Sequence, residues 1–251
     1  GTPPRDTYAY LQQAFVMPGI IQTTDVVADC HCMTPRYLTH QLNASLTNLG
    51  LSCLDLYYLH NPEMQLEEVS QDEFMTRLRA AFETLEEAAS QGKLRLYGTA
   101  TWNGYRAKPG SGGHLSLDAL VRLAEDVAGK DHHFKVVQLP YNIGMLEALG
   151  QQTQTLNGVK FSLLEAAKAL GIYVMSSASI LQGQLSRNLP AGLREVLGDG
   201  TDAQRAIQFV RSTPGLGTAL VGMKRVEHVT DNLAVSKRAP LPPKQFAQLF
   251  K

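Results

Sequence analysis

The sequence predicts an α/β fold with parallel strands, because short apolar runs alternate with helical patterns along the chain. The runs are apolar on both faces, which is typical of parallel strands covered by helices. They recur about every 40 residues, which leaves room for one crossover helix between consecutive strands. The expected strands are CLDLYYLH (53–60), LRLYGTAT (94–101), KVVQLP (135–140), IYVMSSAS (172–179) and TALVGM (218–223), with DVVADC (25–30) as a candidate sixth.

Capping residues mark the expected helices. Thr34-Pro35 begins one helix, and the capping box Ser70–Glu73 begins the next, which Gly92 ends. The remaining expected helices are 116–128, FSLLEAAKAL before Gly171, one after the Thr201/Gln204 capping box, and 226–235. The segment RDTYAYLQQAF is expected to form a helix within a loop.

Two connections, 104–116 and 145–158, follow strands and are longer than a minimal loop of about 2–6 residues. We expect these loops to shape a site, because parallel folds place their sites at the carboxyl ends of strands. No composition break or low-complexity linker divides the chain, so residues 1–251 are expected to form a single domain.

Composition excludes several classes of protein. Lys+Arg and Asp+Glu both number 23, and no basic stripe with interleaved aromatics predicts a nucleic-acid partner. No apolar run approaches the roughly 18 residues of a membrane helix. Three cysteines, an odd number, indicate a reducing compartment, and we expect a cytoplasmic location.

Each expected strand ends on polar or small residues, which strand periodicity does not require. The clearest case is His60, which closes an otherwise apolar run and is followed at once by Asn61-Pro62. A single such histidine is more often structural. Five polar strand ends in register instead predict a site at one mouth of the sheet, with His60 as a functional residue.

The last strand leads through Lys224 and Arg225 directly into a helix start, so side-chain charge and backbone N–H groups can meet an anion there. The alternative is a solvated basic turn. The sequence contains neither G-x-G-x-x-G nor a P-loop, and no G-x-S-x-G elbow.

Other motifs are weaker. Cys30-His31-Cys32 resembles a metal motif, but strand alternation would oppose His31 to both cysteines and no second ligand pair follows, so no metal site is predicted. His132-His133 is expected at the surface. The sequon at 43–45 lies inside an expected helix and is discounted.

Four segments together carry a resemblance to the aldo-keto reductase family. SLTNLGLSCLDLYYLHNPE (45–63) resembles that family's signature around its catalytic histidine, and GKLRLYGTATWN (92–103) and VVQLPYN (136–142) resemble two of its strands. ALVGMKRVEHVTDNLAV (219–235) is similar to the closing segment that grips the adenosine end of NADP(H). The likeness covers roughly residues 26–237.

The resemblance implies a (β/α)8 TIM barrel that reduces a small carbonyl substrate by hydride transfer from NADPH, without metal or flavin. It implies that His60 orients and polarises the carbonyl, and that Gln138 binds the nicotinamide carboxamide. The implied cofactor-binding residues are Thr101, Gln138, Ser177, Ser179, Leu181, Gly222, Met223, Lys224, Arg225, His228, Asp231 and Asn232.

The sequence also departs from the family pattern. Ala100-Thr101 replaces a Ser-Asn pair, and Ser177 stands where an aromatic residue usually stacks on the nicotinamide, so Trp102 or Tyr141 is a candidate cover. The family's Asp, Tyr and Lys have no counterpart here, and Gly1–Pro4 reads as loop interior. We therefore expect the domain to be N-terminally incomplete, with the first strands and those three residues among roughly 100 residues upstream.

Two other functions stay open at this stage. One is a non-catalytic, aldo-keto-reductase-like protein that binds the cofactor or senses redox state. The other is an unrelated barrel hydrolase or lyase, although no expected strand ends in the paired carboxylates such chemistry uses. The sequence predicts neither the particular substrate nor the oligomeric state.

Overall fold

The structure is a computed structural model that describes residues 6–250. The chain divides into two compact units, which are described separately. The first runs to Ala100 and includes Gly110–Leu115 and Ala119–Lys135, and the second contains Thr101–Pro109, Ser116–Asp118 and the chain from Val136 onward. The single-domain organisation therefore stays a prediction. The expected loop at Gly1–Pro4 lies outside the described residues.

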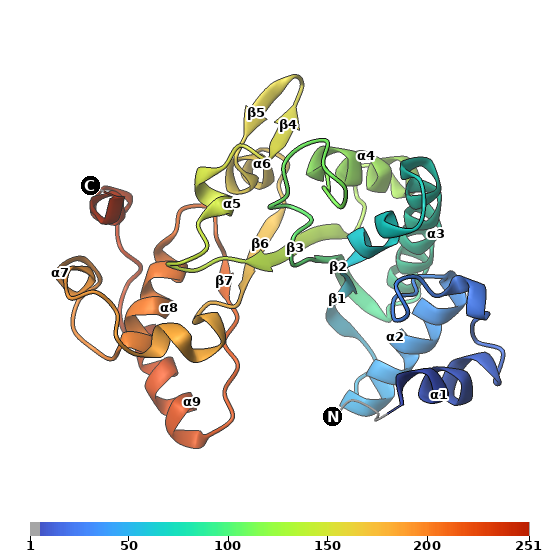
Figure 1. Cartoon of the computed structure of the whole chain (residues 1–251), viewed down its shortest axis with the longest axis horizontal. Helices are drawn as coiled ribbons and strands as arrows, with labels where there is room; N and C mark the ends of the chain where they lie inside the picture. Colours follow the sequence, from blue (N-terminus) through green and yellow to red (C-terminus); the bar gives the residue numbers. More distant parts are fainter. Residues whose placement is uncertain (1–5, 251) are drawn as a thin grey trace. The chain divides into compact units, whose positions relative to one another are not determined.

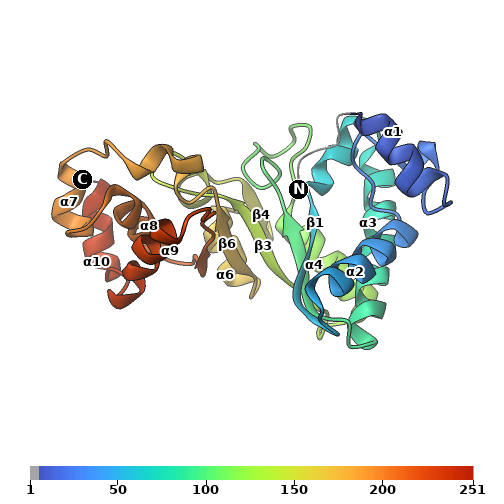
Figure 2. The same ribbon diagram turned by 90° about the horizontal axis from the view of Figure 1, so that it is seen from below.

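The first unit pairs two parallel strands, β1 (Leu54–His60) and β2 (Leu94–Ala100), with His60 opposite Ala100. Helices α2 (Pro35–Leu49) and α3 (Gln71–Ser90) lie on one side of β1 (Figures 1 and 2). The other elements are α1 (Thr7–Leu11), the π-helix η1 (Gln12–Val16), the 3₁₀ segments η2 (Thr23–Asp25) and η3 (Pro62–Glu67), and most of α4 (Leu117–Ala128).

The second unit contains three parallel strands, β3 (Phe134–Pro140), β6 (Tyr173–Ser177) and β7 (Thr218–Ala219), with β6 between the other two. Helix α6 (Leu163–Ala169) contacts β6, and α8 (Asp202–Ser212) contacts β7. The remaining elements are α5 (Glu147–Gly150), the hairpin β4 (Gln154–Leu156) and β5 (Val159–Phe161), η4 (Leu181–Ser186), α7 (Gly192–Leu197), α9 (Val226–Leu233), η5 (Ala234–Lys237), α10 (Pro243–Phe246) and η6 (Ala247–Phe250).

Aromatic side chains form the centre of each core. In the first unit, Phe82 of α3 is fully buried, stacks on Phe134 and meets Tyr97 edge-on. In the second, Tyr141 stacks on Phe209 at a ring-centroid distance of 5.8 Å. Helix α8 thereby packs one face against the segment that follows β3, because Phe209 lies in its interior.

The predicted caps are largely confirmed. Ser70 accepts a hydrogen bond from the Glu73 amide, and Thr201 accepts one from the Gln204 amide. Both predicted capping boxes are only half formed, because the Glu73 side chain pairs with Arg77 and the Gln204 side chain donates to Asp231 instead of reaching back to the N-cap. At Thr201, a contact between α8 and α9 therefore replaces one half of the local capping motif.

Four expectations are wrong in part or in whole. The segment 25–30 is a 3₁₀ turn followed by a single bridge between Val27 and His31, since Ala28 and Asp29 adopt left-handed φ values of 48° and 55°. The last strand is only two residues long instead of spanning 218–223. His132 is buried, at 4% exposure, not at the surface.

The fourth concerns the connection 145–158, which is not a loop. It contains α5 and the first half of a hairpin whose turn is Asn157-Gly158, with φ values of 49° and 79°. Asn-Gly is the preferred type I′ hairpin turn, because both residues tolerate positive φ. No described helix is both long and apolar enough to cross a membrane.

Candidate functional site

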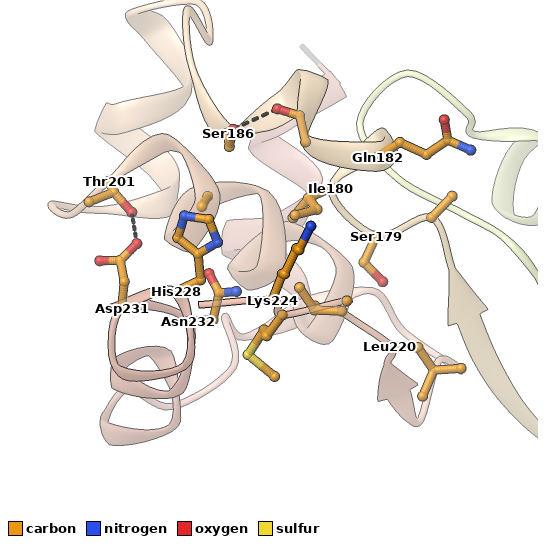
Figure 3. A pocket seen from close by; sticks show the side chains of 16 residues that line it. Ser179, Ile180, Gln182, Ser186, Thr201, Leu220, Lys224, His228, Asp231 and Asn232 are labelled. Carbon is orange, nitrogen blue, oxygen red and sulfur yellow. Dashed lines mark hydrogen bonds between the residues drawn. The ribbon is translucent and has the colours of Figure 1, made fainter. Parts of the chain in front are cut away.

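A cavity of about 980 Å³ lies in the second unit, beside the carboxyl ends of β6 and β7 (Figure 3). Residues of three segments line it: 178–186 after β6, Thr201 and Ala203 at the start of α8, and 220–232 around the start of α9. This volume matches small-molecule sites, which span about 300–1,000 Å³.

The cavity brings together more than half of the cofactor-binding residues that the sequence predicts. Those on its wall come from the turn after β6 and from the segment that leads into α9. They are Ser179, Gly222, Met223, Lys224, His228, Asp231 and Asn232.

The other five predicted residues do not line this cavity. Ser177 is the last residue of β6, Leu181 begins η4, and Arg225 is the exposed N-cap of α9. Gln138 lies on β3, where its carbonyl accepts the Thr101 amide at 2.9 Å. Thr101 is buried, and its hydroxyl has no hydrogen-bond partner among the described residues, so it is a polar group open to a ligand. The roles of all five stay predictions.

The turn after β6 is held by a fully buried asparagine that follows β3. Asn142 Nδ2 donates to the Ala178 carbonyl at 2.9 Å, and its Oδ1 accepts the Gly144 amide at 2.8 Å. Ala178 has a φ of 52°, a left-handed conformation that costs a non-glycine residue roughly 1–2 kcal/mol. Asn142 therefore stabilises the unfavourable backbone that turns the chain into the cavity wall.

The left-handed backbone recurs three residues further on. Leu181, Gln182 and Gly183 have consecutive φ values of 45°, 52° and 90°. Such strain in non-glycine residues is concentrated at binding and switch segments of proteins. Gln182 and Gly183 both line the cavity, so the strained stretch is part of its wall.

Asp231 is engaged within the protein. Its carboxylate accepts hydrogen bonds from Thr201 Oγ1 and Gln204 Nε2, both at 2.9 Å, and the first of these is drawn in Figure 3. The carboxylate therefore ties α9 to the start of α8 and has fewer free lone pairs for a ligand. The expected contact between Asp231 and the adenosine stays a prediction.

The start of α9 suits an anionic group. No side chain caps this helix, because its N-cap is Arg225 and that side chain makes no cap hydrogen bond. The first-turn N–H groups and the positive end of the helix dipole are thus available to an anion. Lys224, the residue before the N-cap, lines the cavity, and Figure 3 shows its side chain extending into it. The residues present therefore fit a phosphate-bearing cofactor.

Replacing Asn142 with alanine is expected to destabilise the protein by about 2–4 kcal/mol, because the fully buried side chain is lost and the Ala178 carbonyl and Gly144 amide lose their partner. Urea unfolding measures this change. Asn43 is exposed on α2, and Asn43→Ala is expected to change stability by less than about 0.7 kcal/mol. Equal effects of the two substitutions would contradict the role given to Asn142.

His60 lies in the first unit, as the exposed last residue of β1. It lines a second cavity of about 310 Å³, together with residues 30–33, three residues of β1 and four of α2. Sequence reasoning singled out His60 but missed the partner that contacts its carbonyl, His31 Nε2, at 2.9 Å. Burial lowers the pKa of His31, and the hydrogen bond to His60 partly opposes that shift.

The two candidates for covering the nicotinamide differ in exposure. Tyr141 is fully buried, its hydroxyl accepts a hydrogen bond from Thr213 Oγ1, and burial raises its pKa to about 12. A ring stacked in the core cannot lie on a ligand, so that suggestion is wrong for Tyr141. Trp102 is 43% exposed and remains a candidate.

Comparisons with known proteins point to one family. Residues 21–108 match the model of the aldo/keto reductase family. A search of curated proteins finds no sequence match to the chain. Segment 21–108 contains His60 and the polar end of β2, so the match includes the strand ends that the sequence singled out.

Solved structures of aldo-keto reductases share the fold of this chain. The holo form of an aldo-keto reductase from Bacillus halodurans has a TM-score of 0.59 at 18% identity, over 91% of this chain and 73% of its own. A proposed 2,5-diketo-D-gluconic acid reductase B has a TM-score of 0.61 at 19% identity, over 96% of this chain and 72% of its own. An aldo/keto reductase from Klebsiella pneumoniae, solved with NADP and acetate, has a TM-score of 0.56 at 21% identity, over 84% of this chain and 63% of its own.

The match to the aldo/keto reductase family model covers residues 21–108, and the solved aldo-keto reductases share the fold with this chain. The parallel α/β fold expected from the sequence is confirmed, and it corresponds to part of the barrel of these reductases.

Proposed function

We propose that this chain binds NADP(H) in the cavity of the second unit and serves the reduction of an aldehyde or ketone. The observation that carries the proposal is the uncapped start of α9, with Lys224 on the cavity wall and Arg225 as the N-cap. The Klebsiella relative is described in complex with NADP, which supports the same cofactor for this chain.

Each group has a proposed task. The 2′-phosphate is proposed to lie between the Lys224 ammonium and the first-turn N–H groups of α9, since charge-assisted hydrogen bonds are the stronger kind. Thr101, with its unpartnered buried hydroxyl, and Gln138 are proposed to hold the nicotinamide amide. The bound cofactor supplies the hydride, and the protein supplies position and electrostatics.

His60 is proposed to donate a hydrogen bond to the substrate carbonyl. Negative charge develops on that oxygen as a hydride reaches the carbon, and a fixed donor lowers the barrier. The substrate is proposed to be a small carbonyl compound, and a cytoplasmic location stays a prediction.

The double variant Lys224→Ala/Arg225→Ala tests the cofactor site. Its affinity for NADPH is expected to fall roughly tenfold or more, and its affinity for NADH less than about threefold, because only NADPH carries the 2′-phosphate. Fluorescence titration with each cofactor measures both constants.

The matched control is Lys237→Ala/Lys244→Ala, which removes two exposed lysines of the same unit that do not line the cavity. This control is expected to leave both affinities unchanged. Equal losses for NADPH and NADH in the first variant would show that Lys224 and Arg225 do not recognise the 2′-phosphate.

A further inference from the structure

His31 connects the buried Gln65 to the end of β1 through its ring nitrogens. Its Nδ1 lies 2.9 Å from Gln65 Nε2, and its Nε2 lies 2.9 Å from the His60 carbonyl oxygen. Gln65 is almost fully buried at 1% exposure, so its end of this hydrogen-bonded series is shielded from water, whereas the bond to the His60 carbonyl lies at the surface. A hydrogen bond is worth more in a protected site than at the surface.

Arg77 of α3 determines the direction of the hydrogen bonds that run from it through Gln65 and His31 to the His60 carbonyl. A guanidinium only donates, and Arg77 Nη1 lies 2.7 Å from Gln65 Oε1. The Gln65 oxygen therefore accepts, its amide nitrogen faces His31, and Nδ1 of His31 must accept. The remaining proton of a neutral His31 is then on Nε2, which donates to the His60 carbonyl.

The receiving carbonyl belongs to a peptide group that is held at both ends. The His60 oxygen accepts from His31, and the N–H of the same peptide, from Asn61, donates to the Ala100 carbonyl of β2 at 2.6 Å. Asn61 is in the left-handed region at φ 47°. Fixing this peptide plane fixes the backbone angles that aim the Cα–Cβ bond of His60.

His31 is itself fixed by its backbone. Its N–H and its carbonyl both pair with Val27, at 2.9 and 2.8 Å, around the turn that replaces the expected strand. The Ala28 amide of that turn donates to Glu68 Oε1 at 2.6 Å. The imidazole therefore has a defined place before any ligand binds, as a positioning group requires.

The same bonds argue against a metal at Cys30-His31-Cys32. Both cysteines line the cavity with His31, but each ring nitrogen of His31 already has a partner. A metal ion would need an imidazole lone pair, and the Nδ1 lone pair is taken by the Gln65 amide.

We propose that His31 is a positioning residue for His60: the donor chain Arg77–Gln65–His31 holds His31 as the neutral Nε2–H tautomer and clamps the His60–Asn61 peptide at the end of β1. The effect of His31 on catalysis rests on the proposed function of His60. The tautomer of His31 and the fixed His60–Asn61 peptide, here called the clamp, do not depend on that function, since they are properties of the first unit alone.

The tautomer is tested by long-range proton–nitrogen NMR of the ¹⁵N-labelled chain at neutral pH. His31 is expected to show a protonated Nε2 and an unprotonated Nδ1. In Gln65→Met, which keeps the length of the side chain but removes the amide, the single tautomer is expected to become a mixture. A protonated Nδ1 in the unsubstituted chain would overturn the proposal.

The clamp is tested with His31→Leu and His31→Gln. Leucine removes the donor, whereas the glutamine amide can reach the place of Nε2. Shifts of the His60 carbonyl carbon and the Asn61 amide are expected to change in His31→Leu and to return toward the native values in His31→Gln. The control His133→Leu removes a histidine of the same unit that bonds Glu86, and it is expected to leave both signals in place.

Measuring turnover of the same variants tests whether His31 affects catalysis. His31→Leu is expected to lower kcat roughly tenfold or more with unchanged NADPH affinity, and His31→Gln to restore it to within about threefold of the native value. Unchanged His60 and Asn61 signals in a folded His31→Leu protein would overturn the clamp. If the unsubstituted chain has no turnover, the proposed function fails, while the NMR results still decide the positioning role.

Discussion

Replacing His60 with alanine is expected to lower NADPH-dependent reduction of an aldehyde by roughly two to four decades, the usual scale for the loss of a general acid or an oxyanion donor. The imidazole is exposed at the end of β1, where a substrate oxygen can reach it. Steady-state kinetics with a panel of aldehydes measures the effect.

Two controls make this result specific. His40→Ala removes an exposed histidine of α2 and is expected to leave turnover unchanged. NADPH affinity is expected to stay unchanged in His60→Ala, since the proposed phosphate site lies in the second unit. Native turnover in His60→Ala would show that His60 has only a structural role. If the unsubstituted chain binds the cofactor without turnover, the non-catalytic alternative is favoured.

Replacing Phe82 with alanine is expected to destabilise the protein by about 3–5 kcal/mol. The ring is fully buried, stacks on Phe134 at 5.1 Å and meets Tyr97 edge-on at the same distance. Alanine leaves a cavity at the contact of α3 with β2, and the stacked geometry is lost as well. Urea unfolding followed by circular dichroism measures the change.

The control for Phe82 is Leu49→Ala, at a position that is 63% exposed at the end of α2. Its effect is expected to be smaller than about 1 kcal/mol. A loss below about 1 kcal/mol in Phe82→Ala would show that the aromatic cluster is not the centre of this core.

Helices and long strands could be predicted because their signals are local. The stripe of α3 and its Ser70 cap lie within one stretch of sequence, and the apolar run of β1 ends at His60 as expected. The strand ends also predicted residues that line one cavity, since Ser179 and Lys224 follow β6 and β7 closely, and their role in cofactor binding stays a prediction.

What could not be predicted depends on contacts between distant segments. Thr201 reaches the cavity because Asp231 ties the start of α8 to α9, 30 residues apart in sequence. A strand over 25–30 would not bring His31 to Gln65 and His60, whereas the left-handed Ala28 and Asp29 fold this segment into a turn that does. The Asn157-Gly158 hairpin is different, because its turn signal is local and lies in the sequence itself.

The central claim, that the cavity at the start of α9 binds NADP(H), is tested most directly by titrating the ¹⁵N-labelled chain with NADPH and following its backbone amide signals. Saturable shifts are expected in residues 178–186 and 222–232, and 2′,5′-ADP is expected to shift the second group. Absence of saturable binding, or shifts confined to residues outside these segments, would contradict the account.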